Sequence, residues 1–477
     1  MADIKILGYT LKEWDHFLDG DCATQAEKAL HYLDGKQEQE VIKVLNDPNK
    51  GRRDWKSNGF IPRYRNLVKP IVTHSGMLFK DQPPTMVIYD KNSIEPNKQA
   101  SEFLYEELSK IEFTEFCITL DETTRLLKTT LILTQFDIEN KELVHTLLHR
   151  GNSAVVLDSN YKNIIGCIYE TSDNDTYRII TEEMIYDIKE SETEQFVIIS
   201  EVPNPYGLVP VTPFYDTNLP RCGFWLTPGM DLVNTNEMLN LHLTDTEFAL
   251  KWAKMPTLFT NCNYSGSGED RLELTQEWGQ KLPVMSANTS KILGGPSRAV
   301  ILDSNGVDSP FAEYKAPVFD VTAMDNVVNG WLYNIAQDWS VRLEINGQAR
   351  ANSGFQLLVE ALPNMELRRE RQKMFTMGFK RWYKIVARIL NIVYGTNKLP
   401  EDAELFVEFQ QPVLPVDEKV NEEIWTTKLN EGRASLIDYF MEVKGMTLEE
   451  SIKKIEEINK YSTIQQKVIN TEQQTNL

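Results

Sequence analysis

Two histidines stand four residues apart in the segment KELVHTLLHR, at positions His145 and His149. If this segment is helical, both imidazoles lie on one face, because residues four apart are neighbours on a helix. Such a pair would supply half of the ligands of a metal site. The sequence offers no obvious third ligand, so a structural role for both histidines is favoured, and we expect neither a metal nor a cofactor.

The sequence lacks the compact motifs that mark common enzyme classes. It contains no GxxxxGK[ST] phosphate loop and no GxSxG, HExxH or EF-hand pattern. The segment LGGPSRAV has glycines but no phosphate-binding lysine, so it is interpreted as a turn. A long chain without such motifs is more consistent with a structural or mechanical part than with an enzyme.

Five basic residues with helical spacing form the clearest charged pattern: Lys373, Lys380, Arg381, Lys384 and Arg388. They follow one stripe of a long predicted helix. Two interpretations stay open. The stripe faces solvent or a neighbouring subunit and pairs with its carboxylates, or it contacts nucleic-acid phosphates locally.

The composition limits what the chain can bind and where it folds. A chain of 477 residues that is 41% hydrophobic can form a packed core. Its net charge of -20 argues against a protein that grips DNA by the phosphates, although not against one that lets DNA pass. The sequence has no apolar run near the roughly 18 residues that span a membrane. Without a signal-peptide pattern or a CxxC pair, we expect folding in a reducing cytoplasm.

Helices are predicted at the start of the chain and strands after residue 151. Thr10-x-x-Glu13 and Thr24-x-x-Glu27 are capping boxes and predict two helix starts. The segment RNLVKPIVTHSGMLFKDQPP and most of residues 97–137 are also predicted to be helical. Short β-branched segments beyond residue 151 predict strands, and the prolines of PNPYGLVPVTPFYD make that segment unsuited to a central strand.

The second half of the sequence predicts an outgoing helix, a β-containing unit at its end, and a helix that runs back. Apolar spacing predicts helices over 227–254 and 317–342, with TLFTNC and AVILDS as short strands between them. A third helix should run from Ser353 to Gly395, a length of roughly 60 Å. It contains Pro363, which removes a backbone hydrogen bond, so a kink is expected there.

This order of elements resembles the portal (head–tail connector) proteins of tailed bacteriophages, over about residues 66–459. The likeness rests on NLVKPIVTHSGMLFKDQP, NPYGLVPVTPFYD, DLVNTNEMLNLHLTDTEFALKWAKMPTLF, NGQARANSGFQLLVEAL and VEFQQPVLPVDE. The resemblance implies an α+β portal fold with a mixed α/β wing, a helical stem, a small β-containing clip, a long kinked helix and a small helical crown.

Mapped onto this sequence, the resemblance places the wing at residues 1–226, with a return strand within 396–415. The other parts would be the stem helices 227–254 and 317–342, the clip 255–316, the tunnel loop 343–352, the kinked helix 353–395, and the crown with its C-terminal tail 416–477.

The resemblance also implies a function without catalysis. The chain would form a homododecameric ring at the unique capsid vertex, in the virion, after assembly in the host cytoplasm. Double-stranded DNA would be packaged and ejected through the ring, and terminase and then the head–tail adaptor would dock on it beside capsid or scaffolding protein. Two alternatives stay open: another virion component such as an adaptor, and an enzyme with an unrecognised site.

Particular residues acquire expected roles from the resemblance. Polar tunnel-loop residues would contact DNA transiently in the channel: Asn346, Gly347, Gln348, Arg350 and Asn352. Pro363 would turn the long helix from the tunnel wall towards the wing. The large stem side chains Trp252, Trp331 and Trp339 would need neighbouring subunits to bury them.

Overall fold

The computed structural model describes residues 5–47, 61–253, 257–260, 263–264, 302–303, 312–315, 320–341, 354–410, 425–444 and 451–455, with short gaps at 17, 19, 81, 92, 161–162, 172–175, 191–195 and 222. The chain divides into two compact units. The first comprises residues 1–348 and 363–410, and the second comprises 349–362 and 411–477. In the described ranges, no helix combines the length and apolar character needed to cross a membrane.

Helices dominate the first part of the first unit. The elements in order are β1 (Lys5–Ile6), β2 (Tyr9–Thr10), α1 (Leu11–His16), α2 (Asp21–Leu33), α3 (Gln37–Asn46), α4 (Val68–His74), β3 (Thr85–Tyr89), α5 (Lys98–Ser109) and α6 (Phe113–Leu127). The capping box at Thr10 is confirmed, because the Glu13 carboxylate accepts from its amide at 2.7 Å. The box at Thr24 is wrong: α2 starts at Asp21, so Thr24 lies inside the helix.

Two other helix predictions are wrong in extent. The helix predicted from RNLVKPIVTHSGMLFKDQPP is only the seven-residue α4. The helical stretch predicted over 97–137 breaks into α5 and α6 and stops at Leu127. Lys128 then adopts a left-handed φ of 65°, and Thr129–Asp137 is a buried strand. Periodicity alone cannot separate such an apolar run from a helix.

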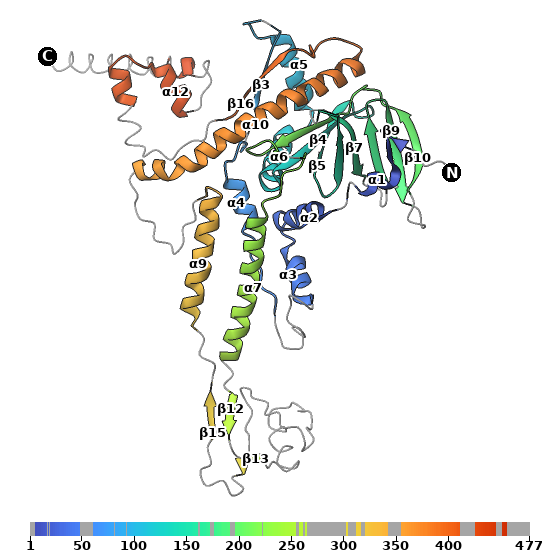
Figure 1. Ribbon diagram of the computed structural model, residues 1–477. Helices are drawn as coiled ribbons and strands as arrows, with labels where there is room; N and C mark the ends of the chain where they lie inside the picture. Colours follow the sequence, from blue (N-terminus) through green and yellow to red (C-terminus); the bar gives the residue numbers. More distant parts are fainter. Residues whose placement is uncertain are drawn as a thin grey trace, which may run out of the picture. The chain divides into compact units, whose positions relative to one another are not determined.

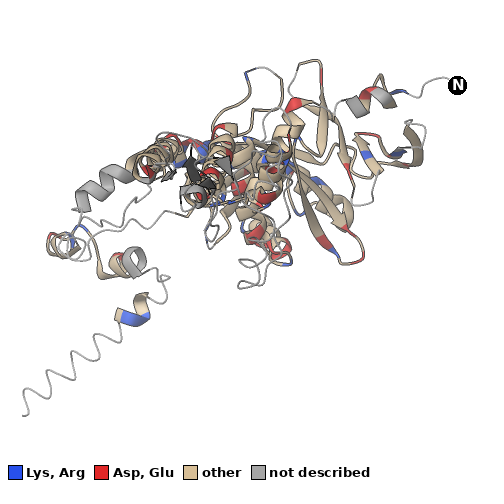
Figure 2. Ribbon diagram, turned by 90° about the horizontal axis from the view of Figure 1, so that it is seen from below, with Lys and Arg blue, Asp and Glu red and all other residues tan. Residues whose placement is uncertain are grey.

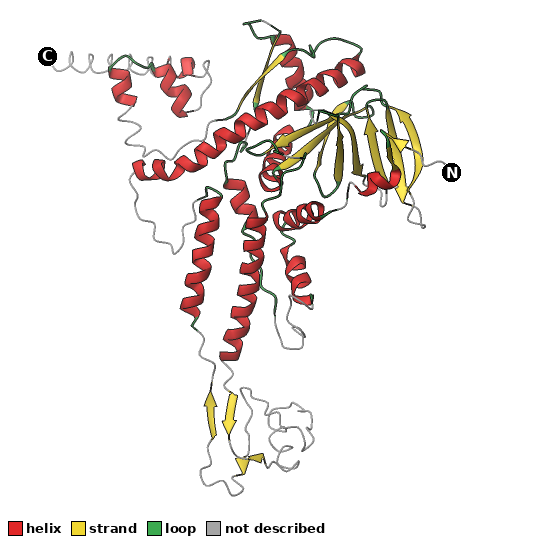
Figure 3. Ribbon diagram, viewed as in Figure 1, coloured by secondary structure: helices red, strands yellow, loops and turns green. Residues whose placement is uncertain are grey.

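Two antiparallel sheets follow (Figure 3). Strands β4 (Thr129–Asp137), β5 (Glu142–Leu148) and β11 (Val211–Tyr215) form the first, in the order β11-β4-β5. The second is a meander of β6 (Ser153–Leu157), β7 (Ile164–Glu170), β8 (Thr176–Thr181), β9 (Met184–Glu190) and β10 (Phe196–Pro203). The expected edge position of the proline-rich segment is confirmed in β11, whose Pro213 cannot donate to a ladder.

The helix, β unit and returning helix predicted for the middle of the chain are present (Figure 1). Helices α7 (Met230–Ala253) and α9 (Val321–Asp338) pack against each other. Between them in sequence, β12 (Thr257–Thr260) pairs with β15 (Ala312–Lys315), and β13 (Asn263–Tyr264) pairs with β14 (Leu302–Asp303). Strand β15 was not among the predicted strands.

The longest helix is α10 (Gly354–Tyr394), which is continuous and contains Pro363. The boundary between the two units also falls at Pro363, and the bend at this residue stays a prediction. Gly395 ends the helix with φ 59°, and Thr396 N–H donates back to the Asn391 carbonyl at 3.1 Å, as a glycine C-cap requires. The chain then forms β16 (Glu404–Glu408), which pairs with β3.

One face of α10 forms the main core of the first unit. Phe375, Phe379 and Trp382 are fully buried there. The ring of Phe214 from β11 packs edge-on against Phe379 with centroids 5.1 Å apart. Gly378 lies under this ring, and a Cβ at that position would come within 2.6 Å of it. The close approach of α10 to β11 therefore depends on a glycine.

The second unit contains α12 (Leu436–Lys444). Its start is fixed by Ser435 and Asp438, because the Asp438 carboxylate accepts from the Ser435 amide at 2.7 Å. Trp425 is buried beside Tyr439, with ring centroids 5.5 Å apart. The sequence Thr447-x-x-Glu450 also has the spacing of a capping box, but it lies outside the described residues.

Two helical glycines give opposite predictions. Gly378→Ala should lower the free energy of unfolding, because the clash with Phe214 costs about 1–3 kcal/mol and outweighs the gain in helix propensity. Gly330→Ala in α9, where a new Cβ meets nothing within 4 Å, should raise it slightly. Urea unfolding of both variants checks this, and an equal response would contradict the packing account.

Candidate functional site

Five charged side chains, four buried and one (Lys128) half-buried, lie together where α6, β11 and α10 meet, and we call them the buried charge cluster. Asp216 follows β11 and accepts from Arg125 at 2.6 Å, from Lys128 at 2.9 Å and from Arg371 at 2.6 Å. Asp121 pairs with Arg371 at 2.7 Å. Asp121, Arg125 and Lys128 come from one segment, and the paired residues of different segments lie 88 to 250 positions apart along the chain.

Burial works against every charge in this cluster, and the neighbouring charges decide the outcome. Burial opposes ionisation of Asp216, but Lys128, Arg371 and Arg125 outweigh it and hold the pKa of Asp216 well below its usual range. Burial lowers the pKa of Lys128 to about 8 even though Asp216 opposes the shift. Burial also raises the pKa of Asp121 against the attraction of Arg371. The ionised Asp216 is thus the charge that holds three cations in the interior.

The cluster reaches the end of α9 through Trp339. This side chain is 3% exposed, and its indole N–H donates to Asp231 of α7 at 2.9 Å. The Arg125 guanidinium and the Lys128 ammonium each lie 4.5 Å from its ring centroid, within cation–π range. The expectation that Trp339 needs a neighbouring subunit for burial is therefore wrong, because its own chain buries it.

The three-residue turn at positions 74–76, at the end of α4, forms hydrogen bonds both to the end of α9 and to α10. The Ser75 hydroxyl donates to the Trp339 carbonyl and accepts from Arg125 at 2.8 Å. On the other side, Asn364 accepts from the Gly76 amide and donates to the His74 carbonyl, both at 2.9 Å. The chain that leaves α9 and the chain that follows Pro363 are consequently fixed to one turn.

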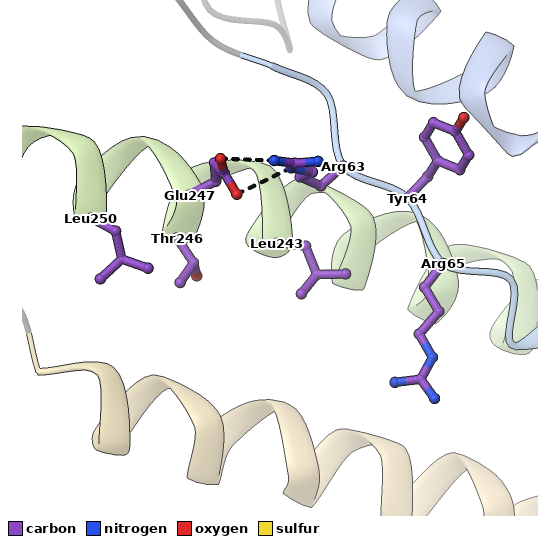
Figure 4. Close-up of a pocket in the computed structure, with 7 residues that line it drawn as sticks. All are labelled: Arg63, Tyr64, Arg65, Leu243, Thr246, Glu247 and Leu250. Atoms are coloured by element: carbon purple, nitrogen blue, oxygen red, sulfur yellow. Dashed lines mark hydrogen bonds and ion pairs between the residues drawn. The ribbon is translucent and has the colours of Figure 1, made fainter.

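Helix α7 is held by an extended segment, residues 61–67, which lies along it (Figure 4). Backbone amides of alternate residues donate to α7 side chains four apart: Arg63 to Thr244 at 2.9 Å, Arg65 to Asn240 at 2.8 Å and Leu67 to Asn236 at 2.8 Å. Two extended residues and four helical residues both advance about 6–7 Å, so the two repeats match. The Arg63 guanidinium adds a two-point contact to Glu247, at 2.8 and 3.1 Å.

The proposed tunnel-loop residues lie outside the described residues: Asn346, Gly347, Gln348, Arg350 and Asn352. The side chain of Trp252 is also outside them. Trp331 is half-buried, with its ring 5.0 Å from that of His242. The structure does not bring the remaining predicted residues into one site.

The basic stripe of α10 is partly neutralised by its own chain. Arg388 donates to the Tyr206 carbonyl at 3.2 Å and pairs with Glu401 at 3.3 Å. Lys373, Lys380, Arg381 and Lys384 are exposed, and none of them forms an ion pair with another described residue. The stripe that remains unpaired therefore has four members.

The metal half-site suggested by His145 and His149 required a helix at this segment, and that helix is absent because the segment forms a strand. His145 lies in strand β5, and His149 follows the end of that strand. The His145 ring packs against Phe113, Phe116 and Trp382, and its two nitrogens have no hydrogen-bond partner among the described residues. No group of metal-ligating side chains occurs in the described part of the chain.

No motif in the sequence predicts the buried charge cluster. One signal was present: Arg371 stands four residues before Phe375 and eight before Phe379, on the apolar face of the predicted helix. A cation on such a face requires a buried partner. The partner Asp216 could not be identified, because it is 155 residues away in sequence.

The sequence matches no protein-family model and no curated protein. Solved structures with a similar fold include the virion of a native gene transfer agent (GTA) particle, at 12% identity and a TM-score of 0.41, covering 83% of this chain and 94% of that chain. The neck of an empty GTA particle computed with C6 symmetry is 11% identical, with a TM-score of 0.39, and the match covers 80% of this chain and 88% of that chain. The neck of a native GTA particle computed with C12 symmetry is 13% identical, with a TM-score of 0.35, and the match covers 78% of this chain and 87% of that chain. Values this low assign the chain neither a family nor a function.

Removing the central carboxylate should destabilise the protein strongly. Asp216→Asn leaves two buried arginines and the half-buried Lys128 with Asp121 as the remaining carboxylate, so we expect a loss of about 3–5 kcal/mol in the free energy of unfolding. Asp402→Asn is the matched control, since Asp402 forms a long, exposed pair with Lys91 and should change stability by less than about 0.5 kcal/mol. Chemical denaturation at pH 7 compares them, and similar losses would refute a central role for Asp216.

His145 should make the fold sensitive to acid. Burial lowers the pKa of His145 from 6.5 to about 4, so the unfolded chain takes up this proton first as the pH falls. Stability should decrease between about pH 6.5 and pH 4, by up to about 3 kcal/mol for this one group. Burial lowers the pKa of His149 to about 4 as well.

His145→Phe should therefore remove about half of the combined histidine effect while keeping the aromatic packing. Unfolding free energies measured from pH 7 to pH 4 provide the comparison. An unchanged pH slope in the variant would show that His145 is not the responsible group.

Proposed function

We propose that this chain is one subunit of a portal ring, the head–tail connector of a tailed bacteriophage, through which double-stranded DNA enters and leaves the capsid. The observation that carries the proposal is the arrangement of α7, the β12–β15 unit, α9 and α10. Within the first unit, a helix leads away from the sheets, a small antiparallel pair of strands follows, and a second helix returns to the buried charge cluster. The long, proline-containing helix comes next in the chain.

In this proposal α7 and α9 form the stem and residues 255–316 form the clip, on which terminase and later the adaptor dock. The sheets and α1 to α6 belong to the wing, which meets capsid or scaffolding protein. Residues 343–352 form the tunnel loop around the DNA. The contacts that the turn at Ser75 makes with Trp339 and Asn364 support this role, because they fix the chain on both sides of that loop.

The net charge of -20 fits a channel that must not retain DNA. DNA carries about one negative charge per 1.7 Å of its axis. An acidic ring repels this charge and keeps the barrier to sliding low. The packaging energy comes from a separate ATPase in this proposal, in accord with a sequence that has no phosphate loop.

The proposed stem exposes apolar side chains that an assembled ring would cover. Met238 of α7 is 49% exposed, and Val327 and Tyr333 of α9 are 48% and 51% exposed. A closed ring has heterologous interfaces, in which one face of each subunit meets a different face of the next. The α7–α9 pair supplies apolar area for such an interface.

The oligomeric state tests the proposal directly. We expect the purified chain to form closed rings of about twelve copies with a central channel, visible by electron microscopy and by native mass spectrometry. A chain that stays monomeric or dimeric at micromolar concentration, or that forms open filaments, would contradict the portal assignment.

Charges placed on the stem should prevent ring formation without unfolding the subunit. The double variant Met238→Glu and Val327→Glu changes only exposed positions, so its thermal unfolding should match that of the unaltered chain while its rings are lost. Ile138→Glu in the β4–β5 turn, at an 81% exposed position away from the stem, should leave the rings intact. Sedimentation velocity compares the three proteins, and rings in the double variant would rule out this interface.

A further inference from the structure

The exposed face of α10 carries a charge that nothing in the described part of the chain neutralises. Lys373, Lys380, Arg381 and Lys384 form this unpaired basic stripe. Acidic residues are spread over most elements of the protein (Figure 2), and the net charge is -20. A compact positive stripe on such a protein is a local exception.

The stripe has the periodicity of a helix-binding surface. Lys380 and Lys384 stand four apart, and like charges at this spacing destabilise an isolated helix by a few tenths of a kcal/mol. Met377 lies in the middle of the stripe and is 40% exposed. An apolar side chain between the lysines favours a protein partner over a phosphate backbone, because a phosphate offers nothing for it to pack against.

An acidic face with the same repeat occurs on α5. Glu102, Tyr105 and Glu106 are exposed and line a shallow hollow, and Tyr105 is 72% exposed. Neither glutamate forms an ion pair with another described residue. The opposite face of α5, with Ala100 and Leu104, is buried in the core.

The two faces do not neutralise each other within one chain. Helix α5 contacts the C-terminal end of α10, where Tyr394 donates to Glu107 at 3.1 Å and its ring packs against Phe103. Lys384 lies ten residues before Tyr394, which is about 15 Å along the helix. Since both helices bury their inner faces in the same core, their charged faces point outwards and remain available to another molecule.

We propose that the unpaired basic stripe of one copy docks on Glu102 and Glu106 of a neighbouring copy. This inference rests on the proposed ring, in which a heterologous interface joins two different faces of identical subunits. Lysines four apart match glutamates four apart when the helices lie side by side, since both rows repeat every 6 Å. Tyr105 then offers its ring to Arg381 and its edge to Met377.

Charge reversal and charge exchange test the pairing. Lys380→Glu with Lys384→Glu should raise the protein concentration at half-assembly by about tenfold or more, and Glu102→Lys with Glu106→Lys should do the same. Combining all four substitutions should restore assembly to within about threefold of the unaltered chain. Ring formation of the unaltered chain should also weaken between 50 and 500 mM NaCl, because salt screens exposed charges.

A matched control separates the pairing from a general effect of charge. Lys69→Glu with Lys189→Glu changes the net charge equally at exposed positions in α4 and β9, outside both helices, and should leave assembly unchanged. Sedimentation velocity over a concentration series measures all five proteins.

Three results would overturn the inference. Normal rings in the Lys380/Lys384 variant would show that the stripe is not an interface. Loss of rings without recovery in the fourfold variant would show that α5 is not its partner. If the Lys380/Lys384 variant forms normal rings but binds a double-stranded DNA oligonucleotide more weakly than the unaltered chain does, the stripe is a nucleic-acid contact. If the unaltered chain forms no rings, the portal proposal itself fails, and that result is distinct because no variant is involved.

Discussion

The interaction of the buried Asp216 carboxylate with two buried arginines and the half-buried Lys128 is the constraint on which the described structure depends. Arg125 and Lys128 come from the end of α6, and Arg371 comes from α10. None of these charges could remain in the interior without its counterpart, because an unpaired buried ion costs several kcal/mol. The charge cluster therefore defines the geometry at which sheet and helices meet.

The buried charge cluster also positions the ends of the long helices. Arg125 contacts both Ser75 and the Trp339 ring, and so it ties the end of α9 to α6 and to the turn after α4. The Gly76 carbonyl accepts from Arg371 at 2.8 Å, and the same turn binds Asn364. A subunit built in this way holds the proposed stem and the long helix on one rigid base, while the segment 61–67 fixes α7 along its length.

Positive charge is used in two contrasting ways along α10. Arg371 is buried and neutralised within the chain by Asp121 and Asp216. About two and a half and three and a half turns later, Lys380 and Lys384 are exposed and lack a partner among the described residues. The buried arginine stabilises the subunit, whereas the exposed lysines gain a counter-charge only when another molecule supplies one. The first arrangement suits folding and the second suits assembly.

Features that depend on local contacts can be predicted from the sequence alone. The capping box at Thr10, the glycine end of α10 at Gly395, and the order of α7, short strands and α9 could be read from spacing and turn chemistry. Most strands after residue 151 were predictable for the same reason, since β-branched segments alternate with turn residues.

Features that depend on residues distant in sequence arise from tertiary packing and could not be predicted from the sequence. Residues 129–137 form a strand because β5 and β11 pair on either side of them, and this also removes His145 from any helical metal face. Trp339 is buried because Arg125, Lys128 and Asp231 surround it. The buried charge cluster joins residues up to 250 apart in sequence, and side-chain burial over such separations is set by packing rather than by local propensity.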